Sequence, residues 1–255
     1  MPQATRTPRL AVLIDADNAS AQIATGLFEE IAKLGEASVR RIYGDFSSTR
    51  LRGWADILAQ HAIMPHQTFA YTTGKNASDI ALVIDAMDLL HSGRFDGFCL
   101  VSSDSDFTRL AARIREDGID VYGFGEQKTP ESFRQACRRF VYTENLLPEA
   151  PSADETAEPK AKRSKALKPP SAAVPLFNKV IALADDDAGW VSLGAVGQRL
   201  VDMAPDFDPR TFGHVKLSDL VEKCGGFELR REDGGGVFIR RKPTTRRVQP
   251  AKSKS

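Results

Sequence analysis

The sequence predicts an α/β domain built on a parallel sheet, followed by a smaller α+β domain. Between residues 8 and 147, apolar strand-like runs alternate with segments that have the 3.6-residue periodicity of helices. Strict alternation of this kind is typical of a parallel sheet with helices on both faces. After residue 171 the pattern changes to three helical segments and a hairpin. We therefore expect a three-layer domain of the Rossmann-like type and a second domain of another architecture.

The strands of the first domain are expected at apolar runs bounded by polar or turn residues. "RLAVLIDA" is continuously apolar up to its aspartate, as expected for a strand buried on both faces. Pro65 places the third run towards a sheet edge because proline cannot donate a ladder hydrogen bond. The expected strands are 9–16, 37–46, 63–71, 95–103 and 119–125, with a closing strand or extension at 141–146.

Helical segments lie between these runs. The segment "AQIATGLFEEIAKLG" repeats apolar residues at helical spacing and ends at Gly35. The segment 77–93 is apolar on nearly all sides, which predicts a deeply packed helix. Together the expected helices are 21–35, 48–62, 77–93, 106–118 and 129–140.

A flexible linker is expected at 148–171, because this stretch is rich in proline, alanine and charge and has no apolar periodicity. The second domain, 172–242, then has three helical segments and the hairpin "FELRREDGGGVFIRRK". Three helices and a hairpin form a winged-helix pattern. Residues 243–255 are a basic tail, expected to be disordered and suited to polyanions.

Composition excludes several classes of protein. The 255 residues are 42% hydrophobic and 27% charged with a net charge of +1, which is ordinary for a protein with a proper core. No apolar run is long enough for a membrane span, and the first residues lack the apolar stretch of a secretory signal. Three cysteines without CxxC spacing argue against a disulfide framework or a thiolate zinc site. We expect a cytoplasmic protein without a membrane partner.

Carboxylates follow two of the predicted strands. Asp15 ends the first strand, Asp104 and Asp106 follow the fourth, and Asp79 lies in the first turn of the helix 77–93. Taken singly, such a residue would be a helix N-cap. The carboxyl ends of parallel strands meet at one edge of the sheet, so we expect these four side chains to converge. Because converging carboxylates repel one another, the pattern indicates a site for Mg²⁺ or Mn²⁺ with oxygen ligands.

A metal site of this kind suits phosphoryl chemistry, since the cation orients water and neutralises charge on the phosphate. Other polar residues near the same edge are candidate phosphate contacts: Asn18, Lys75, Ser102 and Ser103. Asp17 is expected to face solvent or cap a helix, and Asp85 and Asp88 to be structural or peripheral. For Asp45 the sequence leaves two roles open, a turn residue or an outer residue of the site.

Three motifs of the first domain resemble the NYN domain, the PIN-like nuclease fold of LabA-like proteins. They are "VLIDADN", "GKNASDIALVIDAMDLL" and "VSSDSDFTRLAARIREDG". The resemblance covers about residues 8 to 147. It implies a metal-dependent ribonuclease site in which Asp15, Asp79, Asp104 and Asp106 match the acidic positions. Asn18 matches the accompanying amide.

The second domain resembles the OST-HTH or LOTUS domain, through "WVSLGAVGQRL", "PDFDPRTFGHVKLSDLVEK" and "FELRR". This resemblance implies RNA binding, or docking of an RNA-handling protein partner, without catalysis. Independently of it, basic charge at the hairpin favours salt-sensitive contacts to phosphates, with a merely solvated hairpin as the alternative. The residues concerned are Arg230, Arg231, Arg240 and Arg241.

Three functions are consistent with these patterns. The leading hypothesis is a metal-dependent endoribonuclease tethered to an RNA-binding module. The alternative is a non-catalytic RNA-binding regulator that keeps the acidic pocket without using it for cleavage. A third, a haloacid-dehalogenase-like phosphatase, would need Asp15 as nucleophile and Asp17 as general acid, so an Asp17→Asn substitution separates it from the nuclease.

Overall fold

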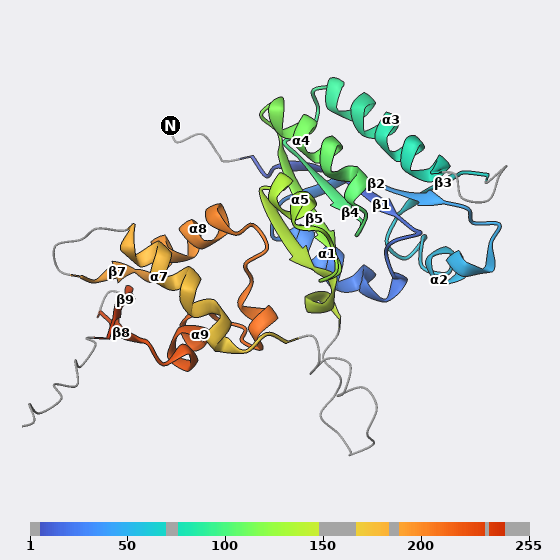
Figure 1. Ribbon diagram of the computed structural model, residues 1–255. Coiled ribbons are helices and arrows are strands. Elements are labelled where there is room, and N and C mark those ends of the chain that lie inside the picture. The colour runs from blue at the N-terminus through green and yellow to red at the C-terminus, as the bar shows by residue number, and fades with distance from the viewer. Residues whose placement is uncertain (1–5, 70–75, 148–166, 184–188, 233–234, 243–255) are drawn as a thin grey trace, which may run out of the picture. The chain divides into compact units, whose positions relative to one another are not determined.

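The computed structural model describes residues 6–69, 76–147, 167–183, 189–232 and 235–242 (Figure 1). Its chain divides into two compact units. The first takes in the chain up to Leu167 together with Val201–Thr211, and the second takes in Lys168–Leu200 and the chain from Phe212 onward. Most of the expected linker and all of the basic tail lie outside the described residues. None of the helices in the described ranges is long and apolar enough to cross a membrane.

The first unit is built on a six-stranded sheet in the order β3-β2-β1-β4-β5-β6. Every neighbouring pair is parallel, which confirms the predicted fold class. The central strand is buried on both faces, and Leu10 to Ile14 are 0% exposed. Pro65 lies in an edge strand, as expected. The strands are β1 (Arg9–Asp15), β2 (Glu36–Gly44), β3 (Met64–Gln67), β4 (Gly97–Val101), β5 (Asp120–Gly125) and β6 (Arg139–Tyr142).

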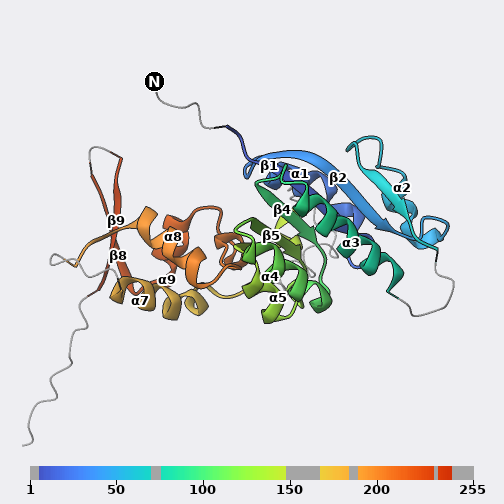
Figure 2. The same cartoon turned by 90° about the horizontal axis from the view of Figure 1, so that it is seen from above.

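Helices cover both faces of this sheet (Figures 1 and 2). One face packs against α3 (Ala77–His91), α4 (Thr108–Glu116) and α5 (Glu131–Ala136). The other packs against α1 (Ala24–Ala32) and α2 (Arg52–Ala55). The two apolar cores on either side of the sheet make the unit a three-layer α/β domain.

The expected helix 48–62 is much shorter in the structure. It consists of η2 (Thr49–Leu51) and the four-residue α2, followed by turns. The backbone hydrogen bonds in these turns span three, four or five residues, unlike the uniform four of an α-helix. The turns end at Ala62, whose φ of 51° is in the left-handed region. The Trp54 indole donates to the Ala19 carbonyl at 2.9 Å, so the segment is held by packing instead of by a regular helix. Shorter 3-10 turns elsewhere in this unit are η1 (Ala21–Ile23), η3 (Ser105–Phe107) and η4 (Thr143–Leu146).

Helix α3 is less deeply packed than its composition suggested. Ile80 is 61% exposed and Ile84 is 58% exposed, so the expectation of burial on nearly all sides was wrong. The helix belongs to an outer layer and turns only one face to the sheet. Asp85 anchors it there by accepting hydrogen bonds from the side chains of Arg41 and Tyr43 on β2.

The second unit is an α+β fold with a three-stranded antiparallel sheet in the order β7-β9-β8, which confirms its predicted class. The short strand β7 was not expected from the sequence. Helix α9 ends at Gly225, whose φ of 73° is the left-handed conformation that glycine adopts without strain. Its elements are η5 (Pro170–Ala173), α7 (Val174–Ala182), β7 (Val191–Ser192), most of α8 (Leu193–Met203), α9 (Leu217–Cys224), β8 (Phe227–Arg231) and β9 (Val237–Arg241). The end of α8 and nearly all of η6 (Pro209–Phe212) lie in the segment Val201–Thr211 of the first unit.

The first unit is completed by Val201–Thr211, a segment far along the chain from its last strand. The backbone nitrogen of Phe140, on β6, donates to the Pro205 carbonyl at 2.7 Å. Asn145 donates through its side-chain amide to the Thr211 hydroxyl at 3.0 Å. The segment therefore satisfies polar groups at the outer edge of the sheet.

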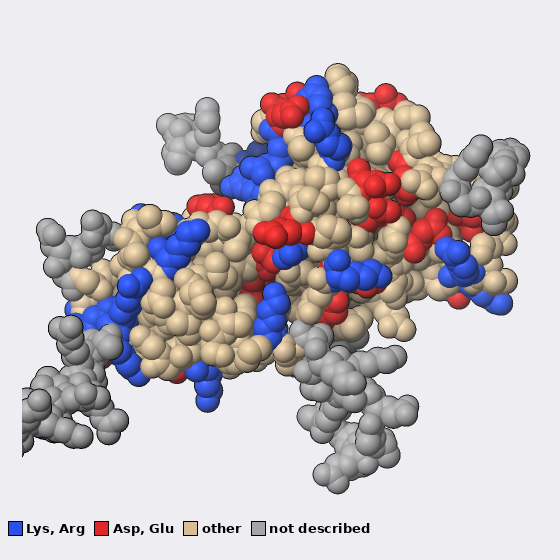
Figure 3. All heavy atoms as spheres, viewed as in Figure 1, with Lys and Arg blue, Asp and Glu red and all other residues tan. Residues whose placement is uncertain are grey.

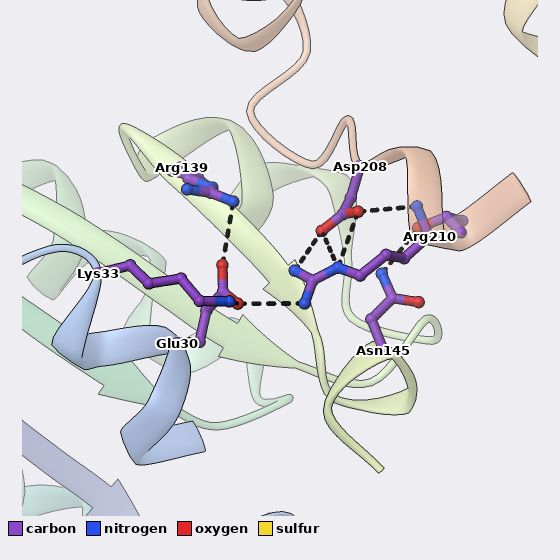
Figure 4. A network of polar contacts seen from close by, with 7 residues as sticks. Glu30, Lys33, Arg139, Asn145, Asp208 and Arg210 are labelled. Carbon is purple, nitrogen blue, oxygen red and sulfur yellow. Dashed lines mark hydrogen bonds and ion pairs between the residues drawn. The ribbon is translucent and has the colours of Figure 1, made fainter. Parts of the chain in front are cut away.

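An ion-pair network around the buried Glu30 joins the same segment to α1 (Figure 4). Glu30 is only 3% exposed, and its carboxylate pairs with Lys33 at 2.9 Å, Arg139 at 3.2 Å and Arg210 at 3.1 Å. Asp208 pairs with Arg210 at 2.6 Å. Burial opposes ionisation of Glu30, but the Lys33 hydrogen bond and the charges of Arg210 and Arg139 outweigh it, so the pKa of Glu30 is lowered. The carboxylate is thus held ionised within the core.

Candidate active site

The candidate site lies where the strand order of the sheet reverses. The strands β1 and β4 pair directly, with Ile14 opposite Val101, and the sheet continues from them in opposite directions to β2 and β5. In open α/β sheets the connections after two such strands diverge and leave a crevice at their carboxyl ends. Asp15 is the last residue of β1, and the loop after β4 leads to Asp104.

Asp15 is buried and fixed in place from three sides. The residue is 1% exposed, and its carboxylate accepts hydrogen bonds from the Ser102 hydroxyl at 2.7 Å and the Asn18 amide at 2.9 Å. The backbone nitrogen of Asp17 donates to it at 3.1 Å. Burial raises the pKa of Asp15, and these hydrogen bonds act in the opposite direction. The strand tip therefore holds a carboxylate in one orientation.

Ser102 connects this carboxylate to the next acidic loop. Its hydroxyl also accepts a hydrogen bond from the backbone nitrogen of Asp104 at 3.0 Å. Asp104 in turn accepts from the backbone nitrogen of Asp106 at 2.9 Å, and so caps the short turn η3. Asp104 therefore caps a turn and also belongs to the acidic edge.

Asp79 shows that the acidic side chains gather at one edge. Burial and then the charges of Asp15, Asp104, Asp17 and Asp106 raise the pKa of Asp79 to about 6. Such coupling arises only between carboxylates that lie near one another. Red atoms cluster around the ends of β1 and β4 in the space-filling view (Figure 3). Asp79 therefore lies near enough to Asp15, Asp104 and Asp106, and also to Asp17, for their charges to act on it.

The additional acid, Asp17, was expected to face solvent or cap a helix, and it is exposed to solvent. Its carboxylate pairs with Arg50 at 2.7 Å and accepts from the Ser78 hydroxyl at 3.3 Å. The spacing of two aspartates in "DAD" was a signal for its place beside Asp15. Nothing in the sequence pointed to Arg50, because it comes from a separate turn, η2.

The expected phosphate contacts have structural partners in the described residues. Asn18 and Ser102 both donate to Asp15, as given above. Ser103 is 8% exposed, and its hydroxyl accepts from the backbone nitrogen of Glu126 at 2.9 Å. These three side chains hold the acidic edge in shape. Lys75 lies outside the described residues.

The donor set at this edge suits a hard divalent cation. It consists of carboxylate oxygens, and one arginine, Arg50, pairs with Asp17 among them. The pKa of Asp79 is raised first by burial and then by the negative charges of the neighbouring carboxylates. In the described ranges, no three His, Cys, Asp or Glu side chains converge closely enough to hold an ion as they stand. Mg²⁺ usually keeps several waters and takes only one or two protein carboxylates, so an open arrangement is compatible with it.

The second unit gathers basic side chains on its hairpin. Lys and Arg atoms lie over β8 and β9 in Figure 3. Two of the four arginines singled out in the sequence have carboxylate partners on the same hairpin: Arg230 pairs with Glu232 and Arg240 with Glu228, both at 2.7 Å. Arg231 lies 3.9 Å from Glu222, and Arg241 donates to the Asn178 carbonyl.

Two solved structures that match the chain have low sequence identity and low TM-scores. A crystal structure of a protein of unknown function from Vibrio parahaemolyticus RIMD 2210633 is 19% identical, with a TM-score of 0.49, over 57% of this chain and 98% of that one. A solution NMR structure of an uncharacterized protein from Nitrosomonas europaea is 29% identical, with a TM-score of 0.27, over 37% of this chain and 93% of that one. No curated protein matches the chain.

Family models match both parts of the chain. The NYN domain model matches residues 9–146, which is more than half of the chain and contains the whole acidic edge. The OST-HTH/LOTUS domain model matches residues 167–239, which contain β8 with Arg230 and Arg231 and the first part of β9, but end before Arg240 and Arg241. The NYN domain is of the PIN-like nuclease type. The protein therefore belongs to the NYN domain family and carries an OST-HTH/LOTUS domain after its NYN domain.

Proposed function

We propose that this protein is a metal-dependent endoribonuclease whose OST-HTH/LOTUS domain binds RNA. The observation that carries the proposal is the position of Asp15 and Asp104 at the carboxyl ends of β1 and β4, where the strand order reverses and where both contact the Ser102 hydroxyl. An excess of negative charge is costly for the fold alone, and a divalent cation would relieve it. The family supports the proposal, since PIN-like nucleases generally use divalent metals.

Asp15, Asp79, Asp104 and Asp106 would hold Mg²⁺ or Mn²⁺ directly or through water. When bound, the cation would activate water and neutralise charge on the scissile phosphate. The chain's own residues supply the orientation: Asp15 is fixed by Ser102 and Asn18 before any substrate arrives. Such preorganisation lowers the reorganisation needed during reaction.

The second domain would raise the local concentration of RNA at this edge. A tethered binding module converts the encounter with substrate into an intramolecular event, at an effective concentration set by the linker. Arginines on the hairpin would then contact phosphates, with affinity that falls as salt rises.

The test is cleavage of an end-labelled single-stranded RNA by the full chain with Mg²⁺, Mn²⁺ or EDTA. Wild type, Asp104→Asn, Asp79→Asn and Asp88→Asn would be compared. Asp88 is the matched control, because it is an exposed aspartate on α3, the helix that also carries Asp79. We expect metal-dependent cleavage by wild type and Asp88→Asn, and loss of at least two orders of magnitude in the other two variants.

Two results would contradict the proposal. One is cleavage that persists in EDTA or in Asp104→Asn, which would assign the activity to another site or to a contaminant. The other is an Asp17→Asn variant that is inactive beside an active Asp79→Asn, which would favour phosphatase chemistry. Salt-sensitive RNA binding without any cleavage would favour the alternative function, a non-catalytic RNA-binding regulator.

A further inference from the structure

An aromatic and guanidinium cluster lies on one face of the second unit's sheet. The guanidinium carbon of Arg230 lies 4.8 Å from the centroid of the Trp190 ring and 5.5 Å from that of Phe238. The guanidinium carbon of Arg240 lies 4.6 Å from the same Trp190 ring. We call these four residues the wing-face cluster. Of them, only the two arginines were singled out from the sequence.

Strand register places this cluster on the face away from the core. Ile239 of β9 is opposite Val191 on one side and Leu229 on the other. Ile239 is 0% exposed and Val191 is 8% exposed, so this row faces inward. Side chains alternate along a strand, and therefore Phe238 and Arg240 point outward, with Arg230 directly opposite Phe238.

The arginines of the cluster are held loosely. Two cations share one indole, and each has a single carboxylate partner, Glu232 for Arg230 and Glu228 for Arg240. The Arg230 side chain is 48% exposed and that of Arg240 is 41% exposed. Ion pairs this exposed contribute little to stability, so either guanidinium can leave the ring at small cost.

We propose that the wing-face cluster binds single-stranded RNA by stacking an unpaired base on Trp190. A base stacked on an aromatic ring gains more than an exposed cation loses on leaving it. The displaced guanidinium then takes a phosphate, for which its planar fork is well matched. The inference deepens the proposed function, since it names the form of RNA that the second domain selects.

The charge of the hairpin favours a polyanion, and the need to stack on a ring favours an unpaired strand over a duplex. In the described part of the hairpin, two glutamates face five cations, namely Arg230, Arg231, Arg240, Arg241 and Lys242. Bases inside a duplex have both faces covered by their neighbours and cannot reach an indole. Aromatic residues on an exposed sheet face are a common platform for single strands.

The test uses tryptophan fluorescence of the full chain carrying Asp104→Asn, which prevents cleavage from complicating the titration. The chain has two tryptophans, Trp54 and Trp190. Trp54 is 2% exposed with its indole nitrogen hydrogen-bonded, so of the two tryptophans Trp190 is the one that added RNA can reach. We expect saturable quenching by a short single-stranded RNA and little by a duplex of the same sequence.

Variants then measure the energetic role of the ring. Trp190→Ala should weaken single-strand binding about tenfold, while Trp190→Phe should retain most of the affinity. Arg230→Ala should weaken binding and lower the slope of log affinity against log salt by about one unit. Val215→Ala is the control, because Val215 is 79% exposed in the same unit and lies outside the cluster.

Equal quenching by single strand and duplex would overturn the inference, and so would an unchanged affinity of Trp190→Ala. Because binding is measured in the Asp104→Asn chain, a failure of the stacking proposal can be told apart from a failure of the nuclease proposal. If wild type cleaves RNA but shows no quenching, the wing-face cluster is excluded and the nuclease stands. If quenching occurs without cleavage by wild type, the cluster stands and the nuclease fails.

Discussion

Replacing Glu30 by glutamine tests whether the ion-pair network around this residue stabilises the first unit (Figure 4). Glutamine keeps the shape of the side chain but removes the charge that Lys33, Arg139 and Arg210 share. The residue is 3% exposed, so water cannot replace the lost interaction at the carboxylate itself. We expect Glu30→Gln to fold and to be less stable than wild type.

The magnitude follows from the exposure of the partners. Removing one member of a fully buried ion pair costs about 3–5 kcal/mol, because the other charge is stranded. Here the side chains of Lys33, Arg139 and Arg210 are 65%, 33% and 27% exposed and stay hydrated. The loss is then that of hydrogen bonds to a charged group, about 2 kcal/mol. With a urea slope of about 2 kcal/mol/M, the midpoint should fall by about 1 M.

Urea unfolding followed by Trp54 emission measures this difference. In a Trp190→Phe background, Trp54 is the one indole left in the chain and reports on the first unit. The pKa of Glu30 is lowered from 4.5 in the folded state, so its contribution is complete above that value. It is lost as the pH falls through the folded pKa. The difference in urea midpoint between wild type and Glu30→Gln should therefore be largest at neutral pH and should disappear in acid.

Equal midpoints at neutral pH would refute the stabilising role of the network. A difference in urea midpoint that stays the same as the pH is lowered would show that glutamine disturbs packing and that the lost charge is not the cause. Arg210→Met gives a further check, because its effect should be smaller in Glu30→Gln than in wild type if the two residues act through one another.

Three further predictions concern packing, anchoring and the acidic edge. Gly26→Ala in α1 should lower the free energy of unfolding by about 1–3 kcal/mol, since its Cβ would lie 2.1 Å from a backbone oxygen. The control Gly53→Ala in α2 meets nothing nearer than 3.5 Å and should gain about 0.5–1 kcal/mol, both by urea unfolding. Tyr43→Phe should lose about 1–3 kcal/mol with its hydrogen bond to Asp85, measured in the same way. Because the pKa of Asp79 is raised from 3.8 to about 6, Asp79→Asn without metal should be more stable than wild type at neutral pH. That gain should shrink as the pH falls below about 6, and Mn²⁺ should raise the melting temperature of wild type more than that of the variant.

Much of the first unit was predictable because its signals are local. Continuous apolar runs such as Leu10 to Ile14 identify strands buried on both faces, and the parallel order follows from alternation with helices. The carboxyl edge then places Asp15 near Asp104 without any knowledge of side-chain contacts. A glycine such as Gly225 fixes a helix end by backbone conformation alone.

Features that depend on contacts between distant residues were not predictable. Nothing local tells that Ser102 holds Asp15, since the bond joins the ends of two different strands. The exposure of Ile80 is hidden because composition records how apolar a helix is and not which layer it occupies. The helix expected at 48–62 gave way to turns because packing of Trp54 outweighed a weak local preference.

Completion of the first unit by Val201–Thr211 has a consequence for biosynthesis. The bond from Arg210 to Glu30 spans 180 positions of sequence, so the growing chain exposes a half-finished network on α1 until most of the protein has been synthesised. Because domains otherwise tend to fold in the order in which they leave the ribosome, this NYN domain should mature late. A fragment cut after Leu147 would contain every acidic residue of the candidate site and yet would lack the last piece of its own fold.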